Sequence, residues 1–318
     1  MDAKFEGWPH IICAQQFSRE WLEKQFFPLT RDMERISENG LLEGMLSNKT
    51  MISLFYEPST RTRFSFEMAM FHLGGKVCGT ESAGHFSSAA KGENLNDSIL
   101  VVNQLGPNVI VLRHHEEGSA AFAAKISNVP IINAGDGIGQ HPTQALLDIY
   151  TIYKKFGTLD GISIAMVGDL MNGRTVRSLS YLLGKFRGIK IYFVSPLCAM
   201  MKGDIKQYLG KHEVEIFEGN DLRLFARKVD VIYQTRTQTE RGTEPFNRDD
   251  NDLGCLVVNQ SILDLIKNDA IIMHPLPRID EISPEVDKDH RAVYLTHQVR
   301  SSVHTRMALL KMILAPRL

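Results

Sequence analysis

Hydrophobic positions along the chain alternate between short β-rich runs and longer stretches with helical spacing. Near the N-terminus, apolar residues recur at helical spacing from Leu22 to Ile36, and Ser18 is the candidate N-cap. Pro28 interrupts this pattern and argues against one unbroken helix. The runs that predict strands are Met51–Tyr56, Val109–Leu112, Ile131–Asn133, Ile162–Val167, Ile189–Val194, Val229–Tyr233 and Ala270–Met273. The stretches that predict helices are Phe64–Leu73, Leu95–Leu105, Thr143–Phe156, Thr175–Phe186 and Ile262–Lys267.

This alternation of strands and helices is typical of an α/β fold, in which helices cover mostly parallel sheets. A chain of 318 residues exceeds what one compact core usually organises, so we expect two domains, each with its own sheet. The glycine-containing segment 156–161 lies between a predicted helix and the next strand and is the candidate boundary. Residues 240–254 are polar and punctuated by glycine and proline, which predicts a long loop.

Composition narrows the class of protein. Hydrophobic residues make up 43% and charged residues 23%, as in an ordinary soluble enzyme, and a net charge of −1 suggests neither nucleic acid nor a membrane surface as a partner. The four cysteines lie far apart, which predicts neither a zinc site nor disulfides. The first ten residues lack the pattern of a signal peptide, and no apolar run approaches the roughly 20 residues of a membrane span. We therefore expect a cytoplasmic protein.

The most informative segment, Glu57–Glu67, begins directly after an apolar run. A strand that leads into the start of a helix presents unpaired backbone N–H groups and the positive end of the helix dipole. Three hydroxyl side chains and Arg61 at the same turn would complete a site for a phosphate group. A helix capped by a hydroxyl, with its arginines in water, fits the same residues equally well.

A second segment, His141–Gln144, follows a loop that contains Gly135 and Gly137. Glycine suits a loop whose backbone approaches a ligand closely. His141 lies just before a helix start, where the positive end of the helix dipole favours a neutral imidazole. Such an imidazole can donate a hydrogen bond to a carbonyl oxygen on which negative charge develops. For a histidine that stands alone, a buried structural role at the helix start is the more common explanation.

Three further segments follow later strands of the pattern. Residues 166–175 run through glycines into a helix, but they lack the GxGxxG spacing of a dinucleotide loop, and the chain contains no GxxxxGK[ST]. Arg174 in this segment therefore suits a carboxylate better than a nucleotide. Arg236 and Gln238 offer a clamp for a dicarboxylate, although for this segment in isolation a charged, solvated loop is the favoured explanation. The prolines of His274–Arg278 would aim carbonyl oxygens at a substrate amine or form a rigid turn.

The conjunction and order of these segments resemble the catalytic chain of the aspartate carbamoyltransferases, within the aspartate/ornithine carbamoyltransferase superfamily. The likeness extends from about Met51 to the C-terminal helix and covers most of the chain. It implies a carbamoyl-phosphate-binding domain over 1–150, completed by a returning helix at 300–318, and an aspartate-binding domain over 151–299. The motifs that carry it are STRTR at 59–63, RH at 113–114, HPTQ at 141–144, GD…GRT at 168–175, TR.Q.ER at 235–241 and HPLPR at 274–278.

The resemblance also implies roles for individual residues, without a metal or a cofactor. Ser87 and Lys91 match a mobile loop that reaches the active site of a neighbouring subunit, so we expect a homotrimer with shared sites. Glu57, Arg174 and Arg241 match residues that bridge the two domains on closure. Carbamoyl phosphate is expected to contact Ser59, Thr60, Arg61, Thr62, Ser87, Lys91, Arg113, His141 and Gln144, and aspartate to contact Lys91, Arg174, Arg236, Gln238, Pro275 and Leu276.

The implied reaction belongs to pyrimidine biosynthesis and gives N-carbamoyl-L-aspartate. The uncharged amino group of aspartate attacks the carbamoyl carbon, a tetrahedral intermediate forms, and phosphate leaves. Proximity and electrostatic stabilisation can supply most of the acceleration. The residues that would stabilise the oxyanion are Thr62, Arg113 and His141, and those that would offset the charge on the departing phosphate are Ser59, Arg61 and Lys91.

Some positions depart from the family pattern. Met171 and Asn172 stand where lysine followed by tyrosine or histidine is common, and Thr239 replaces a lysine, all on the amino-acid side. The closest rival function is carbamoyl transfer to another amine, such as ornithine or an N-acyl-ornithine, but those relatives usually carry HCLP where this chain has His274–Pro277. A non-catalytic subunit that binds carbamoyl phosphate is a rival of another class. Whether regulatory or partner-enzyme chains associate stays open.

Overall fold

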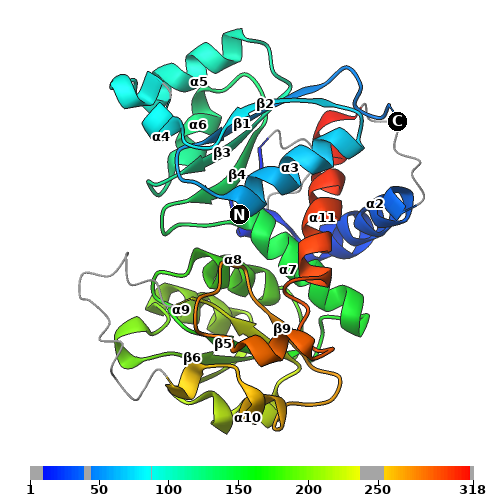
Figure 1. Ribbon diagram of the computed structural model, residues 1–318, viewed down its shortest axis with the longest axis vertical. Coiled ribbons are helices and arrows are strands. Elements are labelled where there is room, and N and C mark those ends of the chain that lie inside the picture. The colour runs from blue at the N-terminus through cyan, green and yellow to red at the C-terminus, as the bar shows by residue number, and fades with distance from the viewer. Residues whose placement is uncertain (1–9, 39–43, 87, 237–253, 316–318) are drawn as a thin grey trace. The chain divides into compact units, whose positions relative to one another are not determined.

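The computed structural model describes residues 10–38, 44–86, 88–236 and 254–315. The chain divides into two compact units, which we call the first unit (Met1–Leu147 with Arg300–Leu318) and the second unit (Asp148–Val299). Each unit holds one parallel β-sheet with helices packed on it (Figure 1). The predicted α/β fold with two sheets is therefore confirmed.

The N-terminal helical region is interrupted, as the sequence predicts. The hydroxyl of Ser18 accepts a hydrogen bond from the amide of Trp21 at 3.1 Å and caps the helix start. Pro28 lies in the first turn of α2, directly after a π-helical segment. Proline has no N–H to donate, so it breaks the regular hydrogen-bond ladder, and the wider π turn precedes it. The parts of this region are α1 (Arg19–Trp21), the π-helix Leu22–Phe26 and α2 (Phe27–Glu38).

The sheet of the first unit has the strand order β2-β1-β3-β4, and all its neighbouring strands are parallel. The predicted strands at β1, β3 and β4 are confirmed, whereas β2 was not predicted. β2 is an edge strand with much of its surface exposed, so its sequence KVCGT lacks the apolar run of a buried strand. Helix α3 packs on β1 and β2, and α6 packs on β3 and β4. The strands are β1 (Thr50–Phe55), β2 (Lys76–Thr80), β3 (Val109–His114) and β4 (Ile131–Asp136).

Helices close the core of the first unit. Leu54, Ile110 and Leu112 of the sheet pack with Ile99 of α5 and Ala123 of α6. The predicted helices at α3, α5 and α7 are confirmed, whereas α6 was not predicted. The helices of this unit are α3 (Thr60–His72), α4 (Ala83–Phe86), α5 (Leu95–Gln104) and α6 (Ser119–Ile126), with the start of α7 (Pro142–Phe156) and most of α11 (His297–Leu314).

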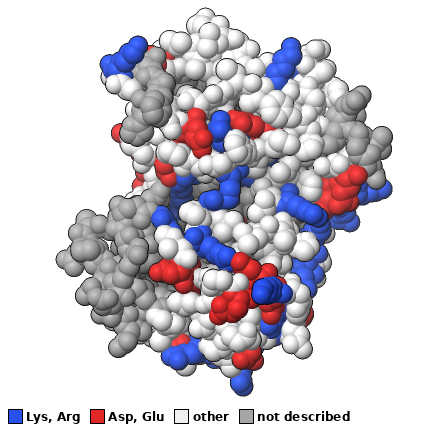
Figure 2. All heavy atoms as spheres, in the orientation of Figure 1, with Lys and Arg blue, Asp and Glu red and all other residues white. Residues whose placement is uncertain are grey.

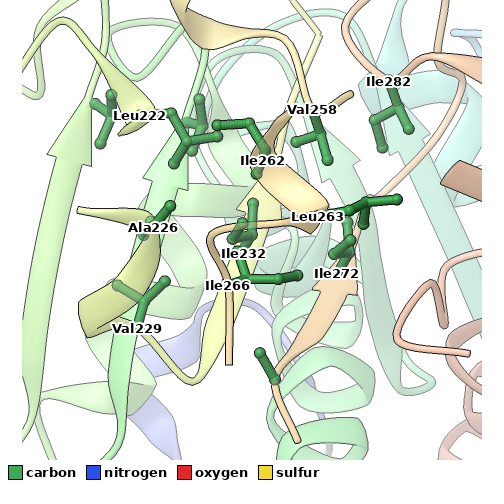
Figure 3. Close-up of a cluster of buried hydrophobic side chains, with 14 of the residues drawn as sticks. Leu222, Ala226, Val229, Ile232, Val258, Ile262, Leu263, Ile266, Ile272 and Ile282 are labelled. Atoms are coloured by element: carbon green, nitrogen blue, oxygen red, sulfur yellow. The ribbon is translucent and has the colours of Figure 1, made fainter. Parts of the chain in front are cut away.

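The sheet of the second unit has the order β7-β6-β5-β8-β9, again parallel. Its edge strand β7 was not predicted, because EIFEG is polar and largely exposed. Ile232 and Ile272 of the sheet pack against Ile262 and Leu263 of α10, as Figure 3 shows. The elements of this unit are β5 (Ser163–Val167), α8 (Arg174–Leu183), β6 (Lys190–Val194), α9 (Gly203–Lys211), β7 (Glu215–Gly219), β8 (Val231–Gln234), α10 (Gln260–Leu263) and β9 (Ile271–Met273).

Both sheets bring the predicted motifs to one edge each. In a parallel sheet every strand ends at the same edge, and ligands bind there. The STRTR, RH and HPTQ motifs follow or end strands of the first sheet, and the GD…GRT, TR and HPLPR motifs follow strands of the second. Among the helices of the described residues, none is both long and apolar enough to cross a membrane.

Candidate active site

In the first unit, the site begins where β1 leads into α3. Ser59 is the N-cap residue of α3, and its hydroxyl donates to the hydroxyl of Thr62 at 3.1 Å instead of capping a backbone amide. The first turn of a 13-residue helix thus keeps backbone N–H groups and hydroxyls together at its positive end. Arg61 lies in the same turn, with its side chain partly exposed. Desolvation lowers the pKa of its guanidinium, which remains a cation at neutral pH.

Arg113 stands next to this turn, near the end of β3. Its backbone is in register with Phe55 of β1, so the two strand ends are adjacent. Arg113 is 8% exposed, and its guanidinium donates to the carboxylate of Glu57 at 2.6 Å and to the carbonyl of Ala134 at 3.1 Å. The ion pair and the carbonyl hold a buried cation at the sheet edge, where an anionic ligand could approach the helix start.

His141 is delivered by the loop that follows β4. The carboxylate of Asp136 accepts from the amide of Gln140 at 2.9 Å, which closes the turn, and from the amide of Gly118 at 3.0 Å, which ties the turn to the start of α6. Gly137 has φ +47°, and a Cβ there would lie 2.7 Å from a backbone nitrogen, so the turn requires glycine. His141 is buried, with its Nδ1 3.4 Å from the hydroxyl of Thr143.

The structure therefore brings most of the predicted carbamoyl-phosphate residues of the first unit to one sheet edge. Gln144 is also buried in the first turn of α7. Lys91 ends a short 3-10 helix and is exposed, and among the described residues the structure gives it no hydrogen bond or ion pair with this edge. Ser87 lies outside the described residues. The residues at the edge are Glu57, Ser59, Thr60, Arg61, Thr62, Arg113, His141 and Gln144.

One acidic residue at this edge was missed by the sequence reasoning. The carboxylate of Glu81 accepts from the hydroxyl of Thr60 at 3.0 Å and pairs with Arg63 at 3.3 Å. Glu81 follows the edge strand β2, which the hydrophobic pattern did not reveal. A partly buried carboxylate that accepts from the Thr60 hydroxyl competes with an incoming anion for that donor.

In the second unit, the corresponding edge is formed by the ends of β5, β8 and β9. The register pairs Val167 with Gln234 and Tyr233 with Met273, so the three motifs that follow are neighbours. Gly168 allows this approach, because a Cβ there would lie 2.4 Å from the carbonyl oxygen of Thr235. The structure of this edge therefore depends on a close contact between two backbones.

Two arginines reach this second edge. Arg174 is the first residue of α8 and is 6% exposed, and Arg236 follows β8 with its side chain partly buried. Pro275 and Leu276 follow β9 and are partly buried. Of the other predicted aspartate-side residues, Gln238 and Arg241 lie outside the described residues. The described edge offers two cations and a backbone segment, a combination that suits a carboxylate-bearing amine.

Buried polar side chains support this edge, and the sequence reasoning did not find them. Examples are the contact of His274 with Glu281 at 2.7 Å and that of Tyr233 with Asp148 at 2.6 Å.

Burial lowers the pKa of His114, beside the first edge, and thus favours its neutral form. No group of three or more His, Cys, Asp or Glu side chains suited to a metal ion occurs among the described residues. Acidic and basic side chains are interspersed on the face shown in Figure 2.

Comparison with known proteins assigns the two parts of the chain separately. Residues 9–154 match the family model of the aspartate/ornithine carbamoyltransferase carbamoyl-P binding domain. Residues 160–313 match the model of the aspartate/ornithine carbamoyltransferase Asp/Orn binding domain. Both matches confirm the resemblance found in the motifs.

Among curated proteins, the chain is 54% identical over 304 residues to the chloroplastic aspartate carbamoyltransferase 1 of Pisum sativum, covering 96% of this chain and 78% of the relative. It is 45% identical to the aspartate carbamoyltransferase catalytic subunit of Thermococcus kodakarensis, covering 94% and 95%.

Solved structures agree. The aspartate transcarbamoylase of Trypanosoma cruzi in complex with N-(phosphonacetyl)-L-aspartic acid superposes with a TM-score of 0.90 at 37% identity, covering 96% of each chain. The catalytic subunit of the M. jannaschii enzyme superposes with a TM-score of 0.88 at 41% identity, covering 96% of this chain and 98% of that one.

Proposed function

This chain belongs to the aspartate/ornithine carbamoyltransferase family, and we infer from that membership and from its site that it transfers the carbamoyl group of carbamoyl phosphate to L-aspartate. The products are N-carbamoyl-L-aspartate and phosphate, in pyrimidine biosynthesis. The observation that carries the choice of aspartate is the pair Arg174 and Arg236 at the second sheet edge. Two guanidinium groups suit a dicarboxylate, whereas the cationic side chain of ornithine would be repelled.

The first sheet edge supplies the carbamoyl phosphate site. The start of α3 binds the phosphate group through backbone N–H groups and the hydroxyls of Ser59, Thr60 and Thr62. Arg61 adds a cation beside them. Phosphate must displace the carboxylate of Glu81 from the Thr60 hydroxyl, which lies within hydrogen-bond distance of it.

The chemistry follows from charge development at the carbamoyl carbon. The C–N bond forms as the uncharged amine attacks, and the carbonyl oxygen gains negative charge. The C–O bond to phosphate then breaks, and the proton lost by the amine passes to the departing phosphate. Arg113 and His141 are buried donors that stabilise this oxyanion, with Thr62 beside them. Arg61 and Ser59 offset the charge that passes to the departing phosphate. A buried site strengthens each of these interactions relative to water.

The second sheet edge binds the amino acid. Arg174 and Arg236 hold its carboxylates, together with Gln238. Pro275 and Leu276 supply backbone oxygens that accept from the amino group and orient its lone pair. Such positioning converts an encounter of two substrates into a reaction within one complex.

The test is an assay of the purified protein with carbamoyl phosphate and, in separate reactions, L-aspartate, L-ornithine and N-acyl-ornithines. We expect carbamoylated product from aspartate alone. Product from an ornithine would overturn the assignment of the arginine pair and leave the phosphate site intact. Binding of carbamoyl phosphate without any product would instead support a non-catalytic subunit.

We also propose that the chain forms a homotrimer in which Lys91 and Ser87 complete the site of a neighbouring subunit. The exposed position of Lys91 at the end of a short 3-10 helix supports this proposal. Mixing inactive Lys91→Ala and Arg61→Ala chains should restore part of the activity, because some sites then receive both wild-type residues. Mixed trimers without activity would contradict it. The cytoplasmic location stays a prediction, and the pea relative is chloroplastic.

A further inference from the structure

The segment that follows β9 is held by a buried histidine. His274 is 2% exposed, and its two ring nitrogens have different partners. Nδ1 accepts from the backbone amide of Leu276 at 2.7 Å, and Nε2 lies 2.7 Å from the carboxylate of Glu281. A nitrogen that accepts from an amide carries no proton, so the proton is on Nε2 and is donated to Glu281. The partners thus select one neutral tautomer of His274.

The amide of Leu276 belongs to an unusual backbone. Leu276 has φ +56°, in the left-handed region that residues with a side chain rarely adopt. Such a conformation persists only where the surroundings favour it over the alternatives. The hydrogen bond to His274 is a direct constraint on this residue. It therefore contributes to the direction in which the carbonyl groups of Pro275 and Leu276 point.

Glu281 ties down the other half of the same loop. Its second carboxylate oxygen accepts from the amides of Ile279 at 3.1 Å and Asp280 at 3.2 Å. Burial of the carboxyl opposes its ionisation, but the hydrogen bonds from His274 and the backbone outweigh burial and lower the pKa of Glu281. One ionised carboxylate thus holds the imidazole and two amides of residues 274–281.

The start of the loop is anchored from the opposite side. The side-chain oxygen of Gln298 accepts from the amide of His274 at 3.0 Å, and its nitrogen donates to the buried carboxylate of Asp148 at 2.7 Å. Asp148 also accepts from the hydroxyl of Tyr233. Tyr233 lies near the end of β8, the strand beside β9, and two residues before Thr235. The loop after β9 is therefore part of a connected buried network, which usually rigidifies the backbone that it joins.

We propose that Glu281, acting through His274, is a positioning residue for the amino-acid substrate. It does not touch the substrate; it fixes the imidazole that holds the Leu276 amide, and so it keeps the backbone oxygens of Pro275 and Leu276 aimed at the substrate amine. This role rests on the proposed function of the second sheet edge. A carboxylate kept buried only for stability would affect both substrates alike, whereas a positioning residue of this loop affects the amino acid selectively.

Glu281→Gln in the full-length chain is the test, since it keeps the size of the side chain and removes the charge and one acceptor. We expect the KM for aspartate to rise about tenfold, the effect of losing one hydrogen bond to a charged group. The Kd for carbamoyl phosphate without aspartate should stay within about twofold, since the first sheet edge is untouched. Glu285→Gln, an exposed residue four positions along, is the matched control and should change neither value.

A second pair of variants makes the proposal testable even where Glu281→Gln fails to fold. In His274→Asn, the amide oxygen takes the place of Nδ1 and can still accept from Leu276. His274→Gln reaches toward Glu281 but lacks that acceptor. We expect the Asn variant to keep a lower KM for aspartate than the Gln variant.

The outcomes separate the two levels of inference. An unchanged aspartate KM in Glu281→Gln, an equal loss for both substrates, or equal KM values in the two His274 variants would overturn the positioning role alone. Wild-type protein that does not carbamoylate aspartate would overturn the proposed function itself.

Discussion

In the proposed function, the two sheet edges bind their ligands in different ways. The first edge combines a helix start with buried side chains, such as Arg113 and His141. The second edge combines two arginines with a stretch of backbone. Glu281 bonds to His274, and His274 accepts from the backbone amide of Leu276 in that stretch. Parallel strands place residues at one edge in both cases, but only at the first edge does one turn of helix, the start of α3, carry several of the proposed recognition groups.

The difference follows from the ligands. A phosphate group is a compact dianion that a helix N-terminus and a few donors can surround. An amino acid carries two carboxylates and an amine, so its site needs donors and acceptors at set positions relative to one another. Backbone carbonyls serve as acceptors for an amine, and their direction depends on the loop that carries them. We therefore expect substitutions at the first edge to affect catalysis and those at the second to affect aspartate affinity.

The largest effect should come from His141→Ala. In the proposed mechanism its imidazole donates to the carbonyl oxygen as charge develops, so its loss should lower kcat about 10²- to 10³-fold. Steady-state kinetics at saturating substrates measure this value. His141→Gln, which retains a donor, should recover part of the activity. A change in aspartate KM with kcat preserved would contradict the division of roles between the edges.

A smaller and selective effect is expected for Arg236→Ala. A hydrogen-bonded charge pair of this kind contributes about 1.5–3 kcal/mol, so the KM for aspartate should rise about 10- to 100-fold. The Kd for carbamoyl phosphate, measured by calorimetry without aspartate, should not change. Arg227→Ala, on a short helix before β8, is the control for loss of an arginine from the same unit. Weaker binding of both substrates would show that the edges are not independent.

Much of this organisation can be predicted from the sequence, and the omissions have physical causes. The buried strands can be recognised in the sequence as apolar runs, and the amphipathic helices as apolar residues at helical spacing. The edge strands Lys76–Thr80 and Glu215–Gly219 do not, since one side of each lacks a neighbouring strand and tolerates polar residues. Helix α9 was not predicted either. It begins with glycine, and Asp204, Lys206 and Lys211 interrupt the spacing of its apolar residues.

The site shows the same division. The STRTR and HPTQ motifs are runs of consecutive residues, so they and their order can be read directly from the sequence. The contacts of Glu281 with His274 and of Gln298 with Asp148 join residues that are 7 and 150 positions apart, and no local pattern marks them. A buried polar network depends on the direction of each side chain in the folded state. The predicted contacts of Gln238, Arg241 and Ser87 lie outside the described residues and stay predictions.

Gly168→Ala should lower the stability of the protein and disturb the second sheet edge without changing the first. Gly168 has φ +115°, and an added Cβ would lie 2.4 Å from the carbonyl oxygen of Thr235, which is backbone and cannot move away freely. Overpacking of this kind costs about 1–3 kcal/mol of unfolding free energy, and the displaced Thr235 precedes Arg236. Urea unfolding and the aspartate KM should both respond. Gly203→Ala, with open space around its Cβ position, is the control and should leave both unchanged.

The smallest expected effect is a pH-dependent change in the free energy of unfolding. It distinguishes residues that stabilise β9 from those that position the 274–281 loop. Asp289 forms hydrogen bonds with the guanidinium of Arg291, next to a backbone bridge between Ile272 and Ala292. The bond from Arg291 lowers the pKa of Asp289 to about 2. A carboxyl whose pKa is lowered by folding contributes stability above its unfolded value of about 4 and loses it as the pH falls toward 2.

The free energy of unfolding of wild-type protein and Asp289→Asn should therefore differ by a constant amount above about pH 5 and converge below pH 4. Urea titrations at pH 6, 4 and 3 measure this, and Asp32→Asn, at an exposed position of the first unit, should show little difference at any pH. Because Asp289 bonds to Arg291, beside the bridge that joins Ala292 to β9, and lies outside the 274–281 loop, its loss should leave the aspartate KM unchanged at pH 7. A raised KM would mean that the loop is positioned by the stability of the whole strand, and the distinction between framework and positioning residues at this edge would fail.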